Sequence, residues 1–246
     1  MVALCLAACS SATPGDRFEP YNRTMFAVNN TFYDYVLFPL SDVYVFITPH
    51  FFRKGVDNIL ETISLPLRMV NFALQAQPEK FADTTGRLMV NLVWGLGVFD
   101  AATRVGVPNH RTDFGKTMYG WGYENSDFFV IPLLGPSTIR DTIGTGVDVA
   151  INPVDNYLRF GPNNRMTSPA IAQGALGALS HGKSAKRLLR EIKASSVDFY
   201  AGVRSMHMQK RRHDLRTNFG RPQVAEDFYF SMDMDDYYEE DDYEKE

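Results

Sequence analysis

The chain has 246 residues, of which 45% are hydrophobic and 13% aromatic, enough for the core of one large domain or two small ones. Its net charge of −4 conceals a division, because residues 226–246 contain eleven acidic side chains and one Lys, and residues 1–225 therefore carry a net +6. Both cysteines, Cys5 and Cys9, lie in the first ten residues, which excludes a disulfide framework or a cysteine metal site in the rest of the chain.

The start of the chain has the features of a processed leader. Residues 1–8 form a short apolar run and are predicted to be a signal-peptide remnant. The sequence LAAC that ends at Cys9 fits a bacterial lipobox, in which cleavage leaves this cysteine as a lipidated N-terminus; a chance match in an apolar leader is the alternative. Ser10, which follows, is typical of delivery to the outer membrane. Residues 9–17 are then a lipid-anchored tether.

Helical spacing of apolar residues predicts a mainly α fold, with one helical domain over residues 18–220. A first helix is expected over residues 22–38, closed by Pro39, and residues 152–164 are expected to form a loop. The predicted starts of further helices are marked by proline: they lie at Thr48-Pro49, Ser64-Leu65-Pro66, Gln77-Pro78, Gly135-Pro136-Ser137 and Ser168-Pro169, the last continuing with breaks to Arg216.

Residues 88–99, LMVNLVWGLGVF, form a run that is apolar on all sides. A spanning helix needs about 20 residues, so this twelve-residue run is too short to cross a bilayer. It is either a core helix or a helix that lies within one leaflet. With a lipid anchor nearby and many aromatic residues around it, we expect helices that lie in the plane of the membrane.

Two charged segments close the chain. Residues 183–216 contain ten Lys and Arg against three acidic residues, which favours a contact with lipid headgroups or a docking face, or else a solvated helix face. Residues 221–246 are predicted to form a disordered acidic tail. No nucleic-acid-binding motif is recognised, and a lipidated chain would lie in the wrong compartment for nucleic acid.

The segment from Asp113 to Asp141 interrupts the helical pattern, because glycines alternate there with large aromatic residues. Such backbone must turn tightly or approach a neighbour closely. Residues 128–134 are expected to form a short buried extended piece. The segment is either a glycine-rich connection packed into a core or a functional element.

The sequence contains no pattern that indicates catalysis. A nucleophile elbow, a phosphate-binding loop and a zinc-binding histidine spacing are all missing from the sequence. A triad assembled from His110, Asp113 and Ser137 would rest on residue type alone. We therefore expect a protein that is not an enzyme and that requires no metal or organic cofactor.

Several motifs resemble those of the MlaA/VacJ family, which are outer-membrane lipoproteins of the intermembrane phospholipid transport system of Gram-negative bacteria. The resemblance covers residues 16–153 and is densest in the central segment. Its motifs are FEPYNR at residues 18–23, NILE at 58–61 with Pro66, Asn71 and Leu74-Gln75, then Arg87, Asn91, Gly95, Gly97 and Asp100, followed by DFG at 113–115, GWG at 120–122, LLGPS at 133–137 and Arg140-Asp141.

This resemblance implies a ring-like bundle of short amphipathic helices in the membrane plane, with a glycine-rich aromatic hairpin segment. It also implies an outer-membrane protein, anchored through Cys9 on the periplasmic side, that removes misplaced phospholipid from the outer leaflet. Its implied partners are phospholipid, the membrane, a trimeric porin and a periplasmic lipid carrier. The central segment is then the candidate channel, with Trp121, Phe128, Val130 and Leu133 as lipid contacts.

Two expectations follow from this assignment. Charges placed at Phe128, Val130 or Leu133 should impair transport while folding and lipidation remain intact. The alternative is a scaffold that binds a porin or another envelope component and moves no lipid, since an apolar groove for a partner helix resembles one for acyl chains.

Overall fold

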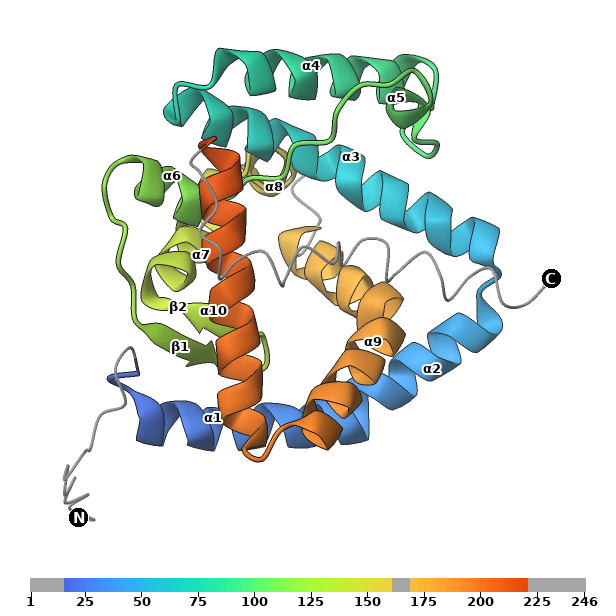
Figure 1. Cartoon of the computed structure of the whole chain (residues 1–246). Coiled ribbons are helices and arrows are strands. Elements are labelled where there is room, and N and C mark those ends of the chain that lie inside the picture. Colours follow the sequence, from blue (N-terminus) through green and yellow to red (C-terminus); the bar gives the residue numbers. More distant parts are fainter. Residues whose placement is uncertain (1–15, 161–168, 221–246) are drawn as a thin grey trace.

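The structure is a computed structural model, and it describes residues 16–160 and 169–220. Helices dominate these residues, which confirms the predicted mainly α class (Figure 1). The elements in chain order are α1 (Glu19–Phe32), η1 (Tyr33–Leu37), α2 (Phe38–Ile47), α3 (His50–Leu74), α4 (Pro78–Val93), α5 (Ala101–Arg104), α6 (Phe114–Gly120), β1 (Phe128–Ile131), β2 (Gly135–Thr138), α7 (Ile139–Ile151), α8 (Pro153–Phe160), α9 (Pro169–Ser195) and α10 (Phe199–Asn218).

The elements form a closed circuit. α1, η1 and α2 make one continuous helical run, and the chain then bends by 119° at Thr48 and Pro49 before α3 begins. α3 packs against α4 and α6, α6 against α7, α7 against the hairpin, and the hairpin against α1. Inside this outline α9 lies along α2, and α10 lies against α6 and β2 (Figure 1). The predicted ring-like arrangement is therefore confirmed, while its orientation to a membrane stays a prediction.

Pro39 does not end the first helix, and that prediction is wrong. The five-residue π-helical turn η1 comes just before it, and there the backbone N–H of Phe38 donates to the carbonyl of Tyr33, five residues earlier. A proline inside a regular α-helix removes a hydrogen bond and clashes with the carbonyl four residues before it. The wider π turn displaces that carbonyl, so Pro39 fits the first turn of α2 and the helix continues.

The helix start predicted at Ser64 is wrong as well, because Pro66 lies inside α3. The Ser64 hydroxyl donates to the carbonyl of Glu61 at 2.6 Å, so a side chain supplies part of the local hydrogen bonding. Leu65 is completely buried. Packing of this stretch therefore outweighs the cost of an interior proline, about 3 kcal/mol. Pro78, by contrast, begins α4 as predicted.

Residues 135–137 form strand β2 rather than the predicted helix start. The two strands are antiparallel, with Ile131 opposite Gly135. Leu133 and Gly135 both adopt positive φ, at 65° and 99°, which closes the tight turn between the strands. α7 begins only after β2, where Thr138 serves as its N-cap. The extended piece predicted over 128–134 is confirmed for β1, and the hairpin is confirmed with it.

The loop predicted over residues 152–164 is wrong in its described part, because α8 begins at Pro153. The side-chain oxygen of Asn152 accepts the backbone N–H groups of Val154 and Asp155, at 3.1 and 3.3 Å. An asparagine cap followed by proline is a strong start for a helix. Residues 161–164 lie outside the described residues. Farther on, α9 and α10 confirm the long, broken helical pattern.

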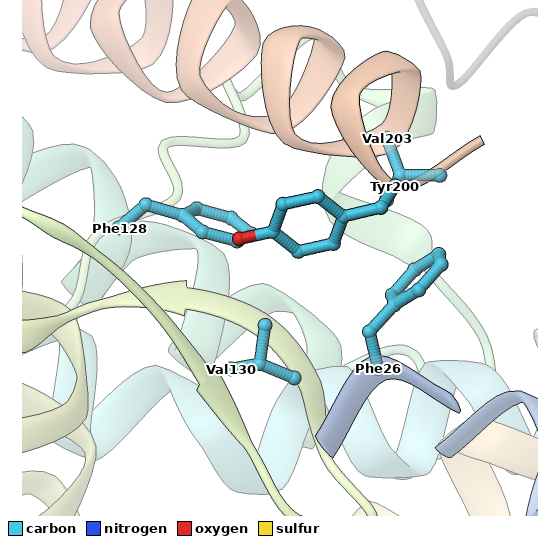
Figure 2. Packing of buried hydrophobic residues seen from close by; sticks show 5 residues of the cluster. All are labelled: Phe26, Phe128, Val130, Tyr200 and Val203. Carbon is cyan, nitrogen blue, oxygen red and sulfur yellow. The ribbon is translucent and has the colours of Figure 1, made fainter. Parts of the chain in front are cut away.

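The hairpin contributes to a small hydrophobic core between α1 and α10. Phe26 comes from α1, Phe128 and Val130 from β1, and Tyr200 and Val203 from α10 (Figure 2). The rings of Phe26 and Tyr200 lie 5.5 Å apart, close to perpendicular, a favourable aromatic geometry. This cluster fixes the hairpin to the helices on both sides.

Candidate functional site

The described residues show a reversed distribution of polarity. Buried polar and charged side chains outnumber buried hydrophobic ones, while many large apolar side chains are exposed. α4 shows this most clearly: Thr84, Arg87 and Asn91 face inward, and Met89, Leu92 and Val93 face outward. Monomeric soluble proteins rarely expose a contiguous apolar patch of this kind. The outer face of α4 is therefore suited to an apolar environment.

Exposed apolar side chains gather over two parts of the ring. Phe46 is 90% exposed and Leu96 is 77% exposed. The two parts are connected, because the rings of Phe51 and Phe99 lie 6.1 Å apart. We call this the apolar surface, and its members are Leu40, Val43, Phe46, Ile47, Phe51, Phe52, Met89, Leu92, Val93, Trp94, Leu96 and Phe99.

The exposure of residues 89–96 decides between the two interpretations of the run at 88–99. A core helix would bury these side chains, so that interpretation is wrong. The helix also ends at Val93, after which Gly95 allows a close approach: a Cβ there would lie 2.1 Å from the carbonyl oxygen of Phe99. Among the described residues, 16–160 and 169–220, no single helix is long and apolar enough to span a bilayer, although α1–α2 and α3, bent against each other, qualify as a pair.

Arg87 holds the segment after α4 in place from the inside. Its guanidinium donates to Asp100 at 2.7 Å, to Thr103 at 2.9 Å and to the carbonyl of Val107 at 3.0 Å. Burial would raise the pKa of Asp100, but hydrogen bonds from Thr103 and the charge of Arg87 outweigh burial and hold that pKa below its usual value. The polar interior thus supports the loop that carries part of the apolar surface.

Two asparagines of α1 bind the free edge of the hairpin. Asn22 accepts the N–H of Val130 at 2.9 Å and donates to the carbonyl of Phe128 at 3.1 Å. Asn29, two helical turns later, accepts the N–H of Leu133 at 2.7 Å and donates to the carbonyl of Ile131 at 2.9 Å. Their amides replace a neighbouring strand. Asn22 belongs to the sequence motif FEPYNR at residues 18–23, but the motif does not indicate these contacts.

The four predicted lipid contacts lie in two different environments. Trp121 is 60% exposed, and its indole N–H donates to the carbonyl of Leu74 at 3.1 Å. Leu133 is half exposed on the hairpin turn. Phe128 and Val130 are buried in the core cluster. This burial makes loss of folding the expected result of a charge at either buried position, instead of the intact folding expected from the sequence, while the role of all four in lipid contact stays a prediction.

The central segment is held by Arg211 of α10, which sequence reasoning did not single out. Its guanidinium donates to both oxygens of Asp113, at 2.9 and 2.7 Å, and to both oxygens of Asp141, at 2.9 and 2.8 Å. Burial would raise the pKa of Asp113, but the bonds and charge of Arg211 hold it below its usual value. Asp113 and Asp141 belong to the sequence motifs, yet their partner lies at least 70 residues away.

Gly115 and Arg140 of the same motifs, together with Gly144 of α7, set the geometry of this segment. A Cβ on Gly144 would lie 2.5 Å from the backbone nitrogen of Gly115, so α6 and α7 touch through bare backbone. Arg140 is buried and donates to the carbonyls of Tyr123 and Glu124, at 3.3 and 3.2 Å. The buried guanidinium of Arg140 thus holds the backbone of the loop at Tyr123 and Glu124 in place.

The basic excess of residues 183–216 is partly used in ion pairs. Lys186 pairs with Asp42, and Arg204 with the buried Asp16 at 3.1 Å. Arg211 is occupied as described above. The remaining basic residues leave the predicted headgroup contact or docking face open, and that role stays a prediction.

The hypothetical triad is not assembled. His110 contacts Asp83 at 3.0 Å, whereas Asp113 is bound by Arg211. The Ser137 hydroxyl donates to the carbonyl of Thr138. In the part of the chain that the structure describes, no group of three or more His, Cys, Asp or Glu side chains is placed to hold a metal ion. Cys9, the tether up to residue 15 and the acidic tail over 221–246 lie outside the described residues.

Comparison with known proteins gives consistent results. A family model described as MlaA lipoprotein matches residues 14–214. The intermembrane phospholipid transport system lipoprotein MlaA of Shigella flexneri is 30% identical over 88% of this chain and 86% of its own length, and its Escherichia coli (strain K12) counterpart matches to the same extent. An uncharacterised protein of Rickettsia prowazekii (strain Madrid E) is 32% identical over 58% of this chain, which spans 57% of that relative.

A solved structure, described as the structural basis for maintenance of bacterial outer membrane lipid asymmetry, superimposes with a TM-score of 0.66. It shares 25% sequence identity and covers 81% of this chain and 98% of its own. The family model accounts for the helical ring, the hairpin and α10, which together contain the motifs described above. The chain belongs to the MlaA lipoprotein family.

Proposed function

We propose that this protein removes misplaced phospholipid from the outer leaflet of the outer membrane and passes it to a periplasmic carrier, which maintains lipid asymmetry. The observation that carries the proposal is the reversed polarity of the ring, with an apolar surface outside and buried polar side chains inside. Its relatives are named as phospholipid-transport lipoproteins, and its structural neighbour concerns lipid asymmetry.

Movement of a phospholipid out of a leaflet requires an apolar environment for the acyl chains and a polar one for the headgroup. In the proposed arrangement the apolar surface lies among the acyl chains, and the helices that carry it lie in the membrane plane. Cys9 carries the lipid anchor, residues 9–17 are the tether, and residues 221–246 are an acidic tail of the single domain at 18–220. A trimeric porin and a periplasmic carrier are the proposed partners, and the activity is transfer rather than catalysis.

The test is complementation of a strain that lacks its own MlaA-like protein, with phospholipid in the outer leaflet as the readout. Phe46→Asp and Leu96→Asp place a carboxylate on the apolar surface, where each should cost up to about 3.5 kcal/mol in the membrane. Both variants should leave more phospholipid in the outer leaflet than the wild type does. Ser205→Asp, which adds the same charge on an exposed position of α10, should behave as the wild type.

A scaffold that moves no lipid gives a different pattern. Native mass spectrometry of protein extracted gently from membranes would find a lipid-transfer protein with bound phospholipid and a scaffold without it. A lipid-empty wild-type protein that also fails to lower outer-leaflet phospholipid in this strain would refute the proposal and support the scaffold. Full complementation by Phe46→Asp would instead refute the role of the apolar surface. Cys9→Ser tests the anchor separately, because it should release the protein from membranes without changing the fold of residues 18–220.

A further inference from the structure

A partly open cavity of about 440 Å³, lined mostly by polar residues, lies where α10 passes the start of α7 and the end of β2. Its volume falls in the range of small-molecule sites, so it could hold a headgroup but not two acyl chains. Apart from Met206, its walls are polar or charged: the others are Asp113, Ser137, Asp141, Thr145, His207, Lys210, Arg211 and Asp214.

Part of this wall is already saturated. The guanidinium of Arg211 donates four hydrogen bonds of 2.7 to 2.9 Å to the carboxylates of Asp113 and Asp141. Asp141 also accepts from the buried Arg140 at 3.2 Å. These groups satisfy one another, so they shape the cavity without offering a binding group for a charged ligand.

Two other wall groups are not saturated within the described residues. Neither Lys210 nor Asp214 has a hydrogen bond or ion pair there, although they lie one turn apart on α10. His207 also belongs to the wall, but its Nε2 atom is buried and its ring packs against Phe128, so that atom is not available to a ligand. Burial lowers the pKa of His207 to about 4, so its ring is neutral near pH 7 and adds no charge to the wall. Lys210 and Asp214 are therefore the wall groups left to bind a charged ligand.

We propose that this cavity binds the phosphate and amine of a zwitterionic phospholipid headgroup. Lys210 would contact the phosphate diester, and the carboxylate of Asp214 would accept hydrogen bonds from the ammonium group. A ligand with one charge of each sign matches a lysine and an aspartate that are not paired with each other. This inference rests on the proposed function and names its substrate class, an ethanolamine phospholipid.

The test uses full-length, delipidated protein in detergent, titrated with phosphatidylethanolamine or phosphatidylglycerol and followed by native mass spectrometry. Lys210→Met should weaken the binding of both lipids about tenfold, because a charge-assisted hydrogen bond to phosphate is lost. Asp214→Asn should weaken phosphatidylethanolamine by a similar factor and leave phosphatidylglycerol unchanged. Arg212→Met is the matched control, since it removes one exposed cation from the same helix outside the cavity. Circular dichroism should show the same helicity for all variants.

The possible results separate the inference from the proposed function. Wild-type protein that binds phospholipid, with Lys210→Met indistinguishable from Arg212→Met, would overturn the headgroup site and leave lipid transfer standing. Wild-type protein that binds neither lipid would refute the proposed function itself. Titration with inorganic phosphate identifies the source of the ligand: binding of phosphate that depends on Lys210, without such dependence for either lipid, would assign the cavity to a free anion and overturn the inference.

Discussion

The hydrogen bonds from Asn22 to the hairpin predict a large and localised loss of stability in Asn22→Leu. The substitution keeps the approximate volume but leaves the N–H of Val130 and the carbonyl of Phe128 buried without partners. Each unsatisfied group costs about 1–3 kcal/mol, so we expect a loss of about 2–6 kcal/mol. That is a large part of the 5–15 kcal/mol typical of a whole domain.

Urea unfolding in one detergent, monitored by circular dichroism, measures this loss, and amide hydrogen exchange of the peptide that contains Val130 locates it. Asn30→Leu is the control, because it makes the same change at a neighbouring position of α1 whose side chain has no hydrogen bond among the described residues. It should change the free energy of unfolding by less than about 0.5 kcal/mol. Equal midpoints for the two variants, with equal exchange at Val130, would refute the role assigned to these amides.

Three further predictions concern other parts of the ring. Gly144→Ala should lower the free energy of unfolding in urea by about 1–3 kcal/mol, because its Cβ would overlap the α6 backbone. Gly146→Ala has open space around it and should raise this free energy by about 1 kcal/mol. Equal effects of the two substitutions would contradict the assigned contact. Val130→Asp should abolish the folded monomer in size-exclusion chromatography, while Leu133→Asp should fold, since Asp tolerates positive φ; a folded Val130→Asp would be the contrary result. The folded-state pKa of His207, about 4, lies below its unfolded value of about 6.5. The stabilisation from the neutral ring should therefore be complete above pH 6.5, and the free energy of unfolding should fall by up to about 3 kcal/mol toward pH 4. His207→Phe should lose less stability over this interval, and a pH profile identical to that of the wild type would refute the assignment.

Helix starts marked by a cap and proline were predictable from sequence because the signal and its effect lie within one turn of each other. Pro78 shows this. Pro39 was predicted to end a helix and Pro66 to begin one, but a π turn in the first case and tertiary packing in the second allow the helix to continue. Such effects depend on contacts with residues that are distant in sequence.

The candidate site was predictable in location but not in its internal contacts. The motifs identified the segment 113–141, yet nothing local indicates that Arg211 binds its two carboxylates from α10. Residues 135–137 form a strand because β1 and the Asn29 amide hold the hairpin, and neither partner is adjacent in sequence. Phe128 and Val130 were placed on a channel because an apolar residue in a glycine-rich loop has the same pattern whether it faces lipid or core.

The orientation of α4 changes which replacements each of its faces should accept, because its buried positions hold Thr84, Arg87 and Asn91. In a water-soluble domain, the positions that reject polar replacements are the buried ones. Along α4 the order is reversed, because Met89, Leu92 and Val93 are exposed and the buried positions hold polar groups that bind the following loop. Apolar replacements should therefore be rejected at the buried positions, where they would remove these hydrogen bonds, and a core located from hydrophobicity alone would be placed on the wrong side of this helix.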